Sequence, residues 1–353
     1  MARLGDIATY VNGYAFKPSD WSDTGLLIIR IQDLTGNSYQ ANRYNGKYDK
    51  RYEVNSGDIL ISWSASLGVY VWAGEKAVLN QHIFKVVFNK ADVNKNFFVY
   101  QVQNILENAT LQAHGATMKH LTKPVFDALP FNLPSMEEQQ RIAAVLDRVY
   151  GLISLRKQQL AKLDKLVKAR FMEMFGDPIK NTLGLPTKTL GEICLLKAGI
   201  TTPANAIFGY DAEHKIPCYG GNGIRGYVKE STQHGTYPII GRQGALCGNI
   251  QFAQGDFHAT EHAVLVMPRQ EINIYWLFYL LKYMDLYRYH TGAAQPGLAV
   301  KTLNTVEVPI ADLALQDEFA ILIEKINRHK LTIQQSSDKL EVLKKSLMQE
   351  YFG

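Results

Sequence analysis

Two short motifs contain residue types at spacings that could perform chemistry. Gly221-Asn-Gly-Ile-Arg-Gly226 fits the G-x-G-x-x-G pattern of dinucleotide sites, and His258-Ala-Thr-Glu-His262 fits the H-x-x-E-H pattern of zinc proteases. The first pattern needs a helix after its glycines, and the second needs a helix that carries both histidines. Strand-like sequence follows in both cases, at Tyr227-Val228 and at Ala263-Val-Leu-Val-Met267. We therefore expect an exposed glycine-rich loop and a strand, with a zinc metallohydrolase built on His258 and His262 as the enzyme alternative.

Other catalytic signatures are missing from the sequence. It has neither a G-x-x-x-x-G-K-[ST] phosphate loop nor the Asn/Asp-Pro-Pro-aromatic run of enzymes that methylate amino groups of bases. The three cysteines, Cys194, Cys218 and Cys247, form no Cys-x-x-Cys pair, which argues against a zinc ribbon or a disulfide framework. The most apolar stretch, Tyr275 to Leu281, is seven residues long and too short to span a membrane. We expect a non-catalytic cytoplasmic protein without a metal ion or a membrane partner.

The sequence of 353 residues consists of two copies of one pattern. Leu4-Gly-Asp-Ile7 matches Leu190-Gly-Glu-Ile193, and Phe175-Gly176 matches Phe352-Gly353 at an offset of 177. Between these matches, each copy has short β-like runs punctuated by glycine, asparagine and aspartate, followed by an aromatic helix candidate. The expected strands are Leu26–Ile31, Ile59–Ser62, Val69–Trp72, Ile83–Phe88, Pro238–Ile240 and Ala263–Met267, and the expected helices are Phe97–Glu107 and Ile274–Tyr287.

Each copy ends in a helix of roughly 40 residues, whose apolar positions alternate in steps of four and three as in a coiled coil. The expected seam residues are Ile142, Leu146, Val149, Ile153, Leu160, Leu163, Val167, Phe319, Ile323, Ile326, Ile333, Leu340 and Leu347. Because such a narrow seam needs a partner, we expect the two helices to pair with each other. The sequence predicts an α+β fold in which two repeated globular α/β domains are separated by two long helices that form an antiparallel, pseudo-twofold coiled coil.

The motifs, taken in order, resemble the DNA specificity subunit of type I restriction–modification systems. The resembling segments are Leu4–Ile7, Gly57–Ser62, Leu79–His82, Pro130–Pro134, Glu138–Ile142, Arg170–Gly176, Cys218–Tyr227, Thr260–His262, Val308–Ile310 and Leu315–Phe319. The resemblance implies target recognition domain 1 in residues 1–135, conserved spacer helix 1 in 136–176, target recognition domain 2 in 177–312 and conserved spacer helix 2 in 313–353. The second copy departs from the first in one respect, because Asp312-Leu-Ala-Leu315 lacks the prolines that precede the first helix.

The resemblance also implies a function and a set of partners. Each head would read one half of a split site in double-stranded DNA, while the helices set the spacing and dock two methyltransferase subunits. The chain itself would bind no cofactor. S-adenosylmethionine would sit on the methyltransferase subunits, and ATP and Mg²⁺ on restriction/translocase subunits. A non-enzymatic protein-binding scaffold with a coiled-coil spacer is the alternative from another class.

The expected DNA-binding residues are polar side chains in loops. Arginine suits the edge of guanine, glutamine suits the edge of adenine, and serine can donate a hydrogen bond to either base. They are Arg30, Gln32, Ser62, Ser64, Ser66, Gln81 and Lys119 in the first copy, and Asn222, Arg225, Arg242, Gln243 and Gln295 in the second. For Trp63, core packing is the favoured interpretation. Residues 177–312 hold 11 basic and 11 acidic groups, so the second head cannot rely on net charge to bind DNA.

Overall fold

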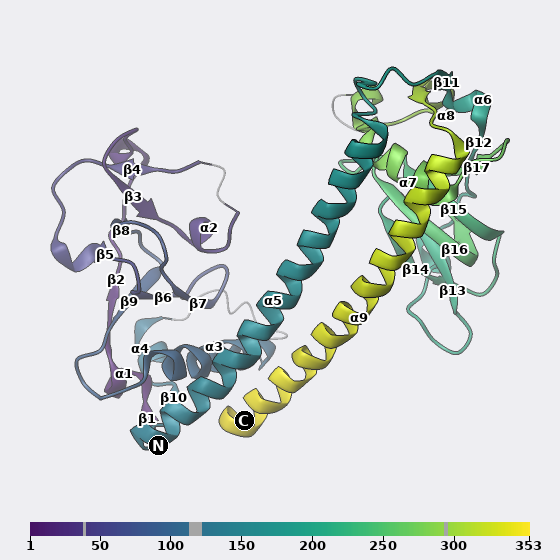
Figure 1. The fold of residues 1–353 in the computed structure, drawn as a ribbon. Helices are drawn as coiled ribbons and strands as arrows, with labels where there is room; N and C mark the ends of the chain where they lie inside the picture. The colour runs from purple at the N-terminus through teal and green to yellow at the C-terminus, as the bar shows by residue number, and fades with distance from the viewer. Residues whose placement is uncertain (38–39, 113–121, 293–295) are drawn as a thin grey trace. The chain divides into compact units, whose positions relative to one another are not determined.

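The computed structural model describes residues 1–37, 40–112, 122–292 and 296–353 (Figure 1). Contacts divide the chain into two compact units. Unit 1 contains Met1–Lys157 with Gln335–Gly353, and unit 2 contains Gln158–Gln334. Each unit therefore combines one predicted head with part of both long helices. The division into recognition domains (1–135 and 177–312) and spacer helices (136–176 and 313–353) stays a prediction.

Unit 1 is built on two four-stranded sheets, whose strands lie in the orders β2-β9-β6-β7 and β4-β3-β8-β5. A two-stranded pair, β1 with β10, joins the two ends of the head. The strands are β1 (Ala2–Arg3), β2 (Thr9–Asn12), β3 (Leu26–Ile29), β4 (Arg43–Tyr44), β5 (Glu53–Val54), β6 (Ile59–Ser62), β7 (Gly68–Val71), β8 (Ala77–Leu79), β9 (Ile83–Val87) and β10 (Pro130–Phe131). The helices of the head are α1 (Leu4–Ile7), η1 (Pro18–Asp20), α2 (Ile31–Leu34), η2 (Lys50–Tyr52), α3 (Lys95–Gln112) and α4 (Lys123–Asp127).

Unit 2 contains one six-stranded sheet in the order β12-β17-β15-β16-β13-β14, and the separate pair β11 with β18. The strands are β11 (Thr187–Thr189), β12 (Cys194–Ala198), β13 (Ile216–Gly220), β14 (Gly223–Val228), β15 (Gln233–Gly241), β16 (Ile250–Ala259), β17 (Ala263–Pro268) and β18 (Glu307–Pro309). The short helices are α6 (Leu190–Ile193), η3 (Ala204–Ala206), α7 (Ile274–Tyr283), η4 (Leu286–Tyr289) and α8 (Val300–Asn304).

The repeat in sequence is a repeat in structure. The order β2-β9-β6-β7 in unit 1 returns as β12-β17-β15-β16 in unit 2, with α1 and α6 at equivalent places. Each head also has a parallel pair of strands, with Ile28 beside Val78 in unit 1 and Cys218 beside His258 in unit 2. His258 therefore occupies a sheet position that the other copy fills with valine.

Two predicted elements end two or more residues earlier than the sequence suggests. The strand predicted for Leu26–Ile31 stops at Ile29, because the backbone N–H of Arg30 donates to Asp33 Oδ2 at 2.8 Å and begins α2. The helix predicted for Ile274–Tyr287 ends at Tyr283. Asp285 then takes a left-handed conformation with φ of 48°, which breaks the helical path before η4.

The core of unit 1 includes side chains from both long helices. Phe97 and Phe98 of α3 pack with Phe131, and Ile142 and Leu146 join the same cluster. From the far end of the chain, Met348 is buried in it, and the Phe352 ring lies 5.5 Å from that of Phe97. The last turn of the chain thus completes the core of the first head.

The core of unit 2 repeats this arrangement around Phe319. The Phe319 ring lies 5.5 Å from both Phe171 and Phe175, and 5.6 Å from Tyr279. Phe319 and Phe171 are fully buried, and burial of one such side chain stabilises a fold by about 1.5–3 kcal/mol. The apolar face of α7 closes the cluster with Trp276.

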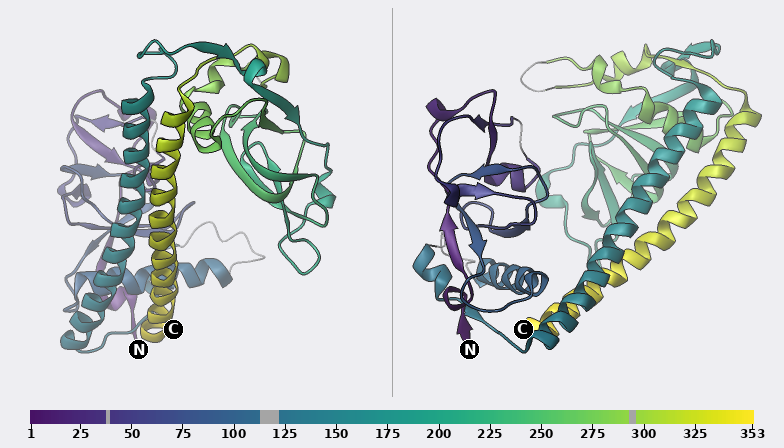
Figure 2. Two further views of the ribbon diagram at one scale, coloured as in Figure 1. Left: turned by 45° about the vertical axis from the view of Figure 1, so that its right-hand side comes forward. Right: turned by 60° about the vertical axis from the view of Figure 1, so that its left-hand side comes forward.

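The two long helices, α5 (Met136–Phe175) and α9 (Leu313–Phe352), run antiparallel within each unit (Figure 2). In unit 1, Arg156 Nε donates to Ser336 Oγ at 3.2 Å. In unit 2, Lys330 Nζ lies 2.5 Å from Asp164 Oδ1. The predicted seam residues are buried or half-buried. The border between the units falls within both helices, after Lys157 and after Gln334.

Candidate nucleic-acid interface

In unit 2, two loops meet at one end of the large sheet and form an open depression, which we call the head-two hollow. Its walls are the β13–β14 hairpin and the loop after β15, and Gly221 and Gly241 let their backbones approach closely. A Cβ atom on Gly241 would overlap the Gly221 carbonyl oxygen, so both loops depend on this glycine. The lining residues are Gly221, Asn222, Gly223, Ile224, Arg225, Gln243, Gly244, Ala245, Leu246 and His262.

The hollow brings together three of the residues expected to bind DNA. Asn222, Arg225 and Gln243 are exposed and line it, and Asn222 Oδ1 accepts a 2.7 Å hydrogen bond from Asn249. Arg242 is half-buried beside it, and its backbone N–H donates to the His262 carbonyl oxygen at 3.0 Å. The G-x-G-x-x-G motif is thus a hairpin turn between two strands, which lacks the helix that a dinucleotide site requires.

In unit 1, the loop after β6 takes the equivalent place, and two of the residues expected to bind DNA are buried in it. Ser62 is fully buried, and its Oγ donates to the carbonyl oxygens of Ser64 and Ser66. Ser64 is only 5% exposed. Both side chains are therefore buried, and the Ser62 hydroxyl stabilises the turn, whereas Ser66 is exposed and Gln81 is partly buried. Trp63 packs half-buried, stacked 5.6 Å from the Phe84 ring.

Arg30 is also engaged within the protein. It is an ion-pair partner of Asp33 at 4.0 Å, donates to the Gln40 carbonyl oxygen at 3.3 Å and lies 5.4 Å from the centre of the Trp21 ring. Only 19% of its side chain is exposed, so DNA contact would require Arg30 to leave these partners. Gln32 follows on α2 and is partly buried. Lys119 and Gln295 lie outside the described residues.

One backbone contact recurs in both heads and aligns their loops. The N–H of Trp63 donates to the His82 carbonyl oxygen at 3.2 Å, as that of Arg242 does to His262. The two repeated histidines therefore hold equivalent loop positions. The side chains that follow differ, with serines after Trp63 and Gln243 after Arg242. A common frame thus presents different chemistry in each copy.

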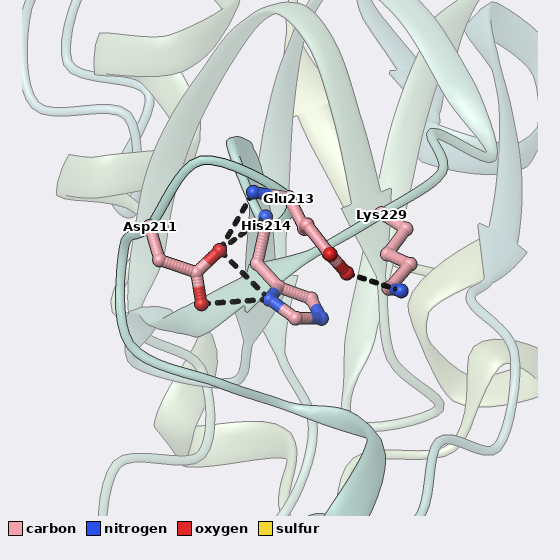
Figure 3. A network of polar contacts seen from close by, with 4 residues as sticks. All are labelled: Asp211, Glu213, His214 and Lys229. Carbon is pink, nitrogen blue, oxygen red and sulfur yellow. Dashed lines mark hydrogen bonds and ion pairs between the residues drawn. The ribbon is translucent and has the colours of Figure 1, made fainter.

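A second loop of unit 2 is held by a charged network (Figure 3). The His214 ring stacks on Phe208 at 4.0 Å, and its Nδ1 lies 2.9 Å from both carboxylate oxygens of Asp211. Hydrogen bonds from the His214 ring and backbone lower the pKa of Asp211 to about 2. Glu213 pairs with Lys229, which directly follows β14, at 2.6 Å, and this pairing lowers the pKa of Glu213. These contacts tie the loop to the edge strand of the sheet.

The two histidines of the H-x-x-E-H motif have separate partners. His258, on β16, has its Nε2 atom 2.7 Å from Thr202 Oγ1, while His262 Nε2 lies 3.1 Å from Glu261 in the turn before β17. No helix carries them, as the sequence predicted. Across residues 1–37, 40–112, 122–292 and 296–353, no three His, Cys, Asp or Glu side chains are placed to hold a metal ion.

Sequence reasoning did not select two residues of the hollow, Ile224 and Leu246. They are apolar and sit among glycines, so composition marks them only as parts of a loop. The structure leaves their side chains 52% and 50% exposed in the hollow walls. The polar residues near them in sequence, Arg225 and Gln243, were the only sequence feature that could have marked these positions as part of the hollow.

Each unit presents polar loops from the end of a sheet, which is an arrangement typical of recognition surfaces. A family model described as the type I restriction modification DNA specificity domain matches residues 1–165 and 184–344. The EcoprrI type I restriction enzyme specificity subunit of Escherichia coli is 37% identical, over 92% of this chain and 86% of its own length. The MjaVIII specificity subunit of Methanocaldococcus jannaschii is 21% identical, over 99% of this chain and 90% of its own.

Solved structures share the fold. The type I restriction–modification S subunit from M. genitalium superposes with a TM-score of 0.62 at 17% identity, covering 99% of this chain and 95% of that chain. A chain from a structure of type I R-M complex assembly gives a TM-score of 0.53 at 15% identity, covering 99% and 96%.

The chain therefore belongs to the family of type I restriction–modification DNA specificity subunits. It is a specificity subunit for DNA, which is the non-catalytic role in such systems. In the described part of the chain, no helix combines the length and the apolar character needed to cross a membrane.

Proposed function

We propose that each head reads one half of a bipartite site in double-stranded DNA. The observation that carries this proposal is the repeated frame with unlike loops: Trp63 and small serines in one head, Arg242 and Gln243 in the other. A protein with two copies of one scaffold and two different loop sets would read two unlike half-sites. The residues that we propose to contact bases are Asn222, Arg225 and Gln243 in head two, and Ser66 and Gln81 in head one.

We further propose that the two helices set the gap between the half-sites and dock two methyltransferase subunits. Leu166 of α5 and Leu343 of α9 stand at the repeat offset of 177 and are 45% and 44% exposed. Two copies of one partner need two equivalent surfaces, and this pair supplies an apolar contact in each unit. Further exposed apolar side chains on the helices are Leu152, Leu155, Ile321, Leu331 and Val342.

In this proposal the chemistry belongs to partner subunits. This chain binds no cofactor; S-adenosylmethionine is bound by the methyltransferase subunits, and ATP and Mg²⁺ by restriction/translocase subunits. Because its ligand is cellular DNA, we place the complex in the cytoplasm. Residues 177–312 are electrically balanced, so head two gains affinity from the assembled complex rather than from net charge.

The experiment is to map methylated sites in DNA exposed to this chain together with its methyltransferase subunits. Arg225→Ala should relax the site at one base pair and weaken binding by roughly five- to 150-fold, the range of a lost bidentate base contact. The matched control is Arg269→Ala, because Arg269 is exposed just beyond the far end of β17, the strand that starts at the hollow. That variant should keep the parent site and affinity.

Two results would contradict the proposal. One is methyl transfer by the purified chain without a partner, since the chain would then be catalytic. The other is methylation by the complex at no defined sequence, or at a single uninterrupted site.

A further inference from the structure

The head-two hollow contains an apolar pair that no recognition role yet includes. Ile224 is at the start of β14 and Leu246 is in the loop after β15, yet both line the hollow with about half of each side chain exposed. A single exposed apolar residue is ordinary on a protein surface. Two of them in the wall of one depression, beside polar side chains, favour a ligand with apolar character.

The backbone holds both side chains at the surface. Gly223, immediately before Ile224, has φ of 94°, and the hairpin is closed by the pairing of Gly220 with Gly223. In the other loop, the buried Cys247 donates its backbone N–H to Gly244 at 3.0 Å. Because Cys247 anchors this turn in the core, the preceding Leu246 remains on the outside.

Polar groups stand directly beside the apolar pair. Arg225 is adjacent to Ile224, Gln243 lies in the loop of Leu246, and Asn222 opens the same hairpin. Arginine pairs with guanine, and asparagine and glutamine pair with adenine, in the major groove. A cation and two amides next to two aliphatic side chains fit an edge that carries hydrogen-bonding groups and a methyl group.

We infer that Ile224 and Leu246 contact the C5 methyl group of a thymine in the half-site read by head two. Thymine is the DNA base that displays a methyl group in the major groove, beside its O4 acceptor. The flanking Arg225, Asn222 and Gln243 then read the neighbouring base edges. This inference rests on the proposed function of head two and adds the chemical group that the hollow selects.

A protein partner is the competing occupant of an exposed apolar pair. The surroundings favour DNA, because an exposed cation and two amides rim the hollow and the family match covers this region as a DNA specificity domain. The fully buried core of a protein–protein interface is instead more apolar than the surrounding surface, at about 65% non-polar area.

The test removes the methyl group from the DNA, which leaves the protein unchanged. With the target site mapped, each thymine is replaced in turn by uracil, and binding of the complex with its methyltransferase subunits is measured. At one or two positions of a single half-site, uracil should weaken binding roughly threefold to fivefold, as the loss of one buried methyl group predicts.

The protein side of the test uses the double variant Ile224→Ala with Leu246→Ala. It should bind thymine-containing DNA about as weakly as the parent binds the uracil duplex, and it should no longer distinguish the two bases. Leu195→Ala is the matched control, since Leu195 is 42% exposed on β12 of the same unit. The control should keep the full discrimination.

The outcomes separate this inference from the proposed function. Specific binding with no sensitive thymine, a target without A·T pairs in either half-site, or discrimination that survives in the double variant overturns the methyl contact alone. Failure of the complex to recognise any defined site overturns the proposed function, and this inference with it. Loss of methyltransferase binding in the double variant assigns the pair to a protein partner and also overturns it.

Discussion

The helices can be tested as a ruler by lengthening both of them at the border between the units. We would insert a copy of residues 158–164 after Lys157 and a copy of residues 328–334 after Gln334. These two points lie opposite each other, between the Arg156–Ser336 contact and the Asp164–Lys330 ion pair. One heptad in each helix keeps the seam in phase, because the apolar pattern repeats every seven residues.

The expected change follows from helix geometry. Seven residues at about 1.5 Å each add roughly 10.5 Å to α5 and to α9. At about 3.4 Å per base pair, this corresponds to roughly three base pairs of added gap. Three base pairs also rotate the duplex by about 100°, given 10–10.5 base pairs per turn, so we expect lower activity as well. DNA deformation could absorb part of the mismatch at a cost of a few kcal/mol.

Sequencing that maps methylated sites, applied to the parent and the extended variant, measures the gap directly. Both half-sites should stay the same, because no loop of either head is altered. Insertion into α5 alone is the control: it leaves the helices unequal and should abolish methylation. An active double-insertion variant with an unchanged gap would refute the reasoning, because the helices would then not determine the spacing.

Three further predictions concern fragments and single groups. Residues 1–176 alone should form a dimer, because each copy lacks the part of α9 that completes head one. Sedimentation should show twice the mass of the fragment, and a monomer would contradict the prediction. Burial raises the pKa of Cys194 to about 12. At pH 8 its alkylation should therefore be at least about a hundredfold slower in the native protein than in urea. Mass spectrometry of the labelled peptide measures both rates, and equal rates would contradict burial. The hydrogen bond with His214 lowers the pKa of Asp211. The stabilisation of the loop by this bond should therefore be present above about pH 4 and lost as the pH falls towards 2. An NMR titration of the Asp211 carboxyl carbon with a midpoint near 4 would contradict this prediction.

The two long helices and the repeat could be predicted because both are periodic. Apolar residues at heptad spacing identify α5 and α9 without knowledge of their partners, and Leu4–Ile7 and Leu190–Ile193 form equivalent helices at the start of each head. The strand setting of His258 could also be predicted, since β-like residues surround it. Motif order then pointed to the family that the comparisons show.

Which loop side chains face solvent was decided only by the tertiary structure. Ser62 and Ser66 are the same residue type four positions apart, yet Ser62 is buried because its hydroxyl donates inside the turn. Ile224 and Leu246 are aliphatic residues among glycines, a composition that does not reveal their exposure, and a glycine hairpin and a buried cysteine leave both exposed.

The sequence by itself determined the class of protein, the duplication and the helix seam, because these depend on local composition and periodic spacing. It did not determine that the last turn of α9, with Met348 and Phe352, closes the core of the first head. Nor did it determine that Asn222 and Gln243 line one hollow. Both depend on contacts between residues far apart in the chain, and burial and hydrogen bonding select such contacts only when the whole unit is folded.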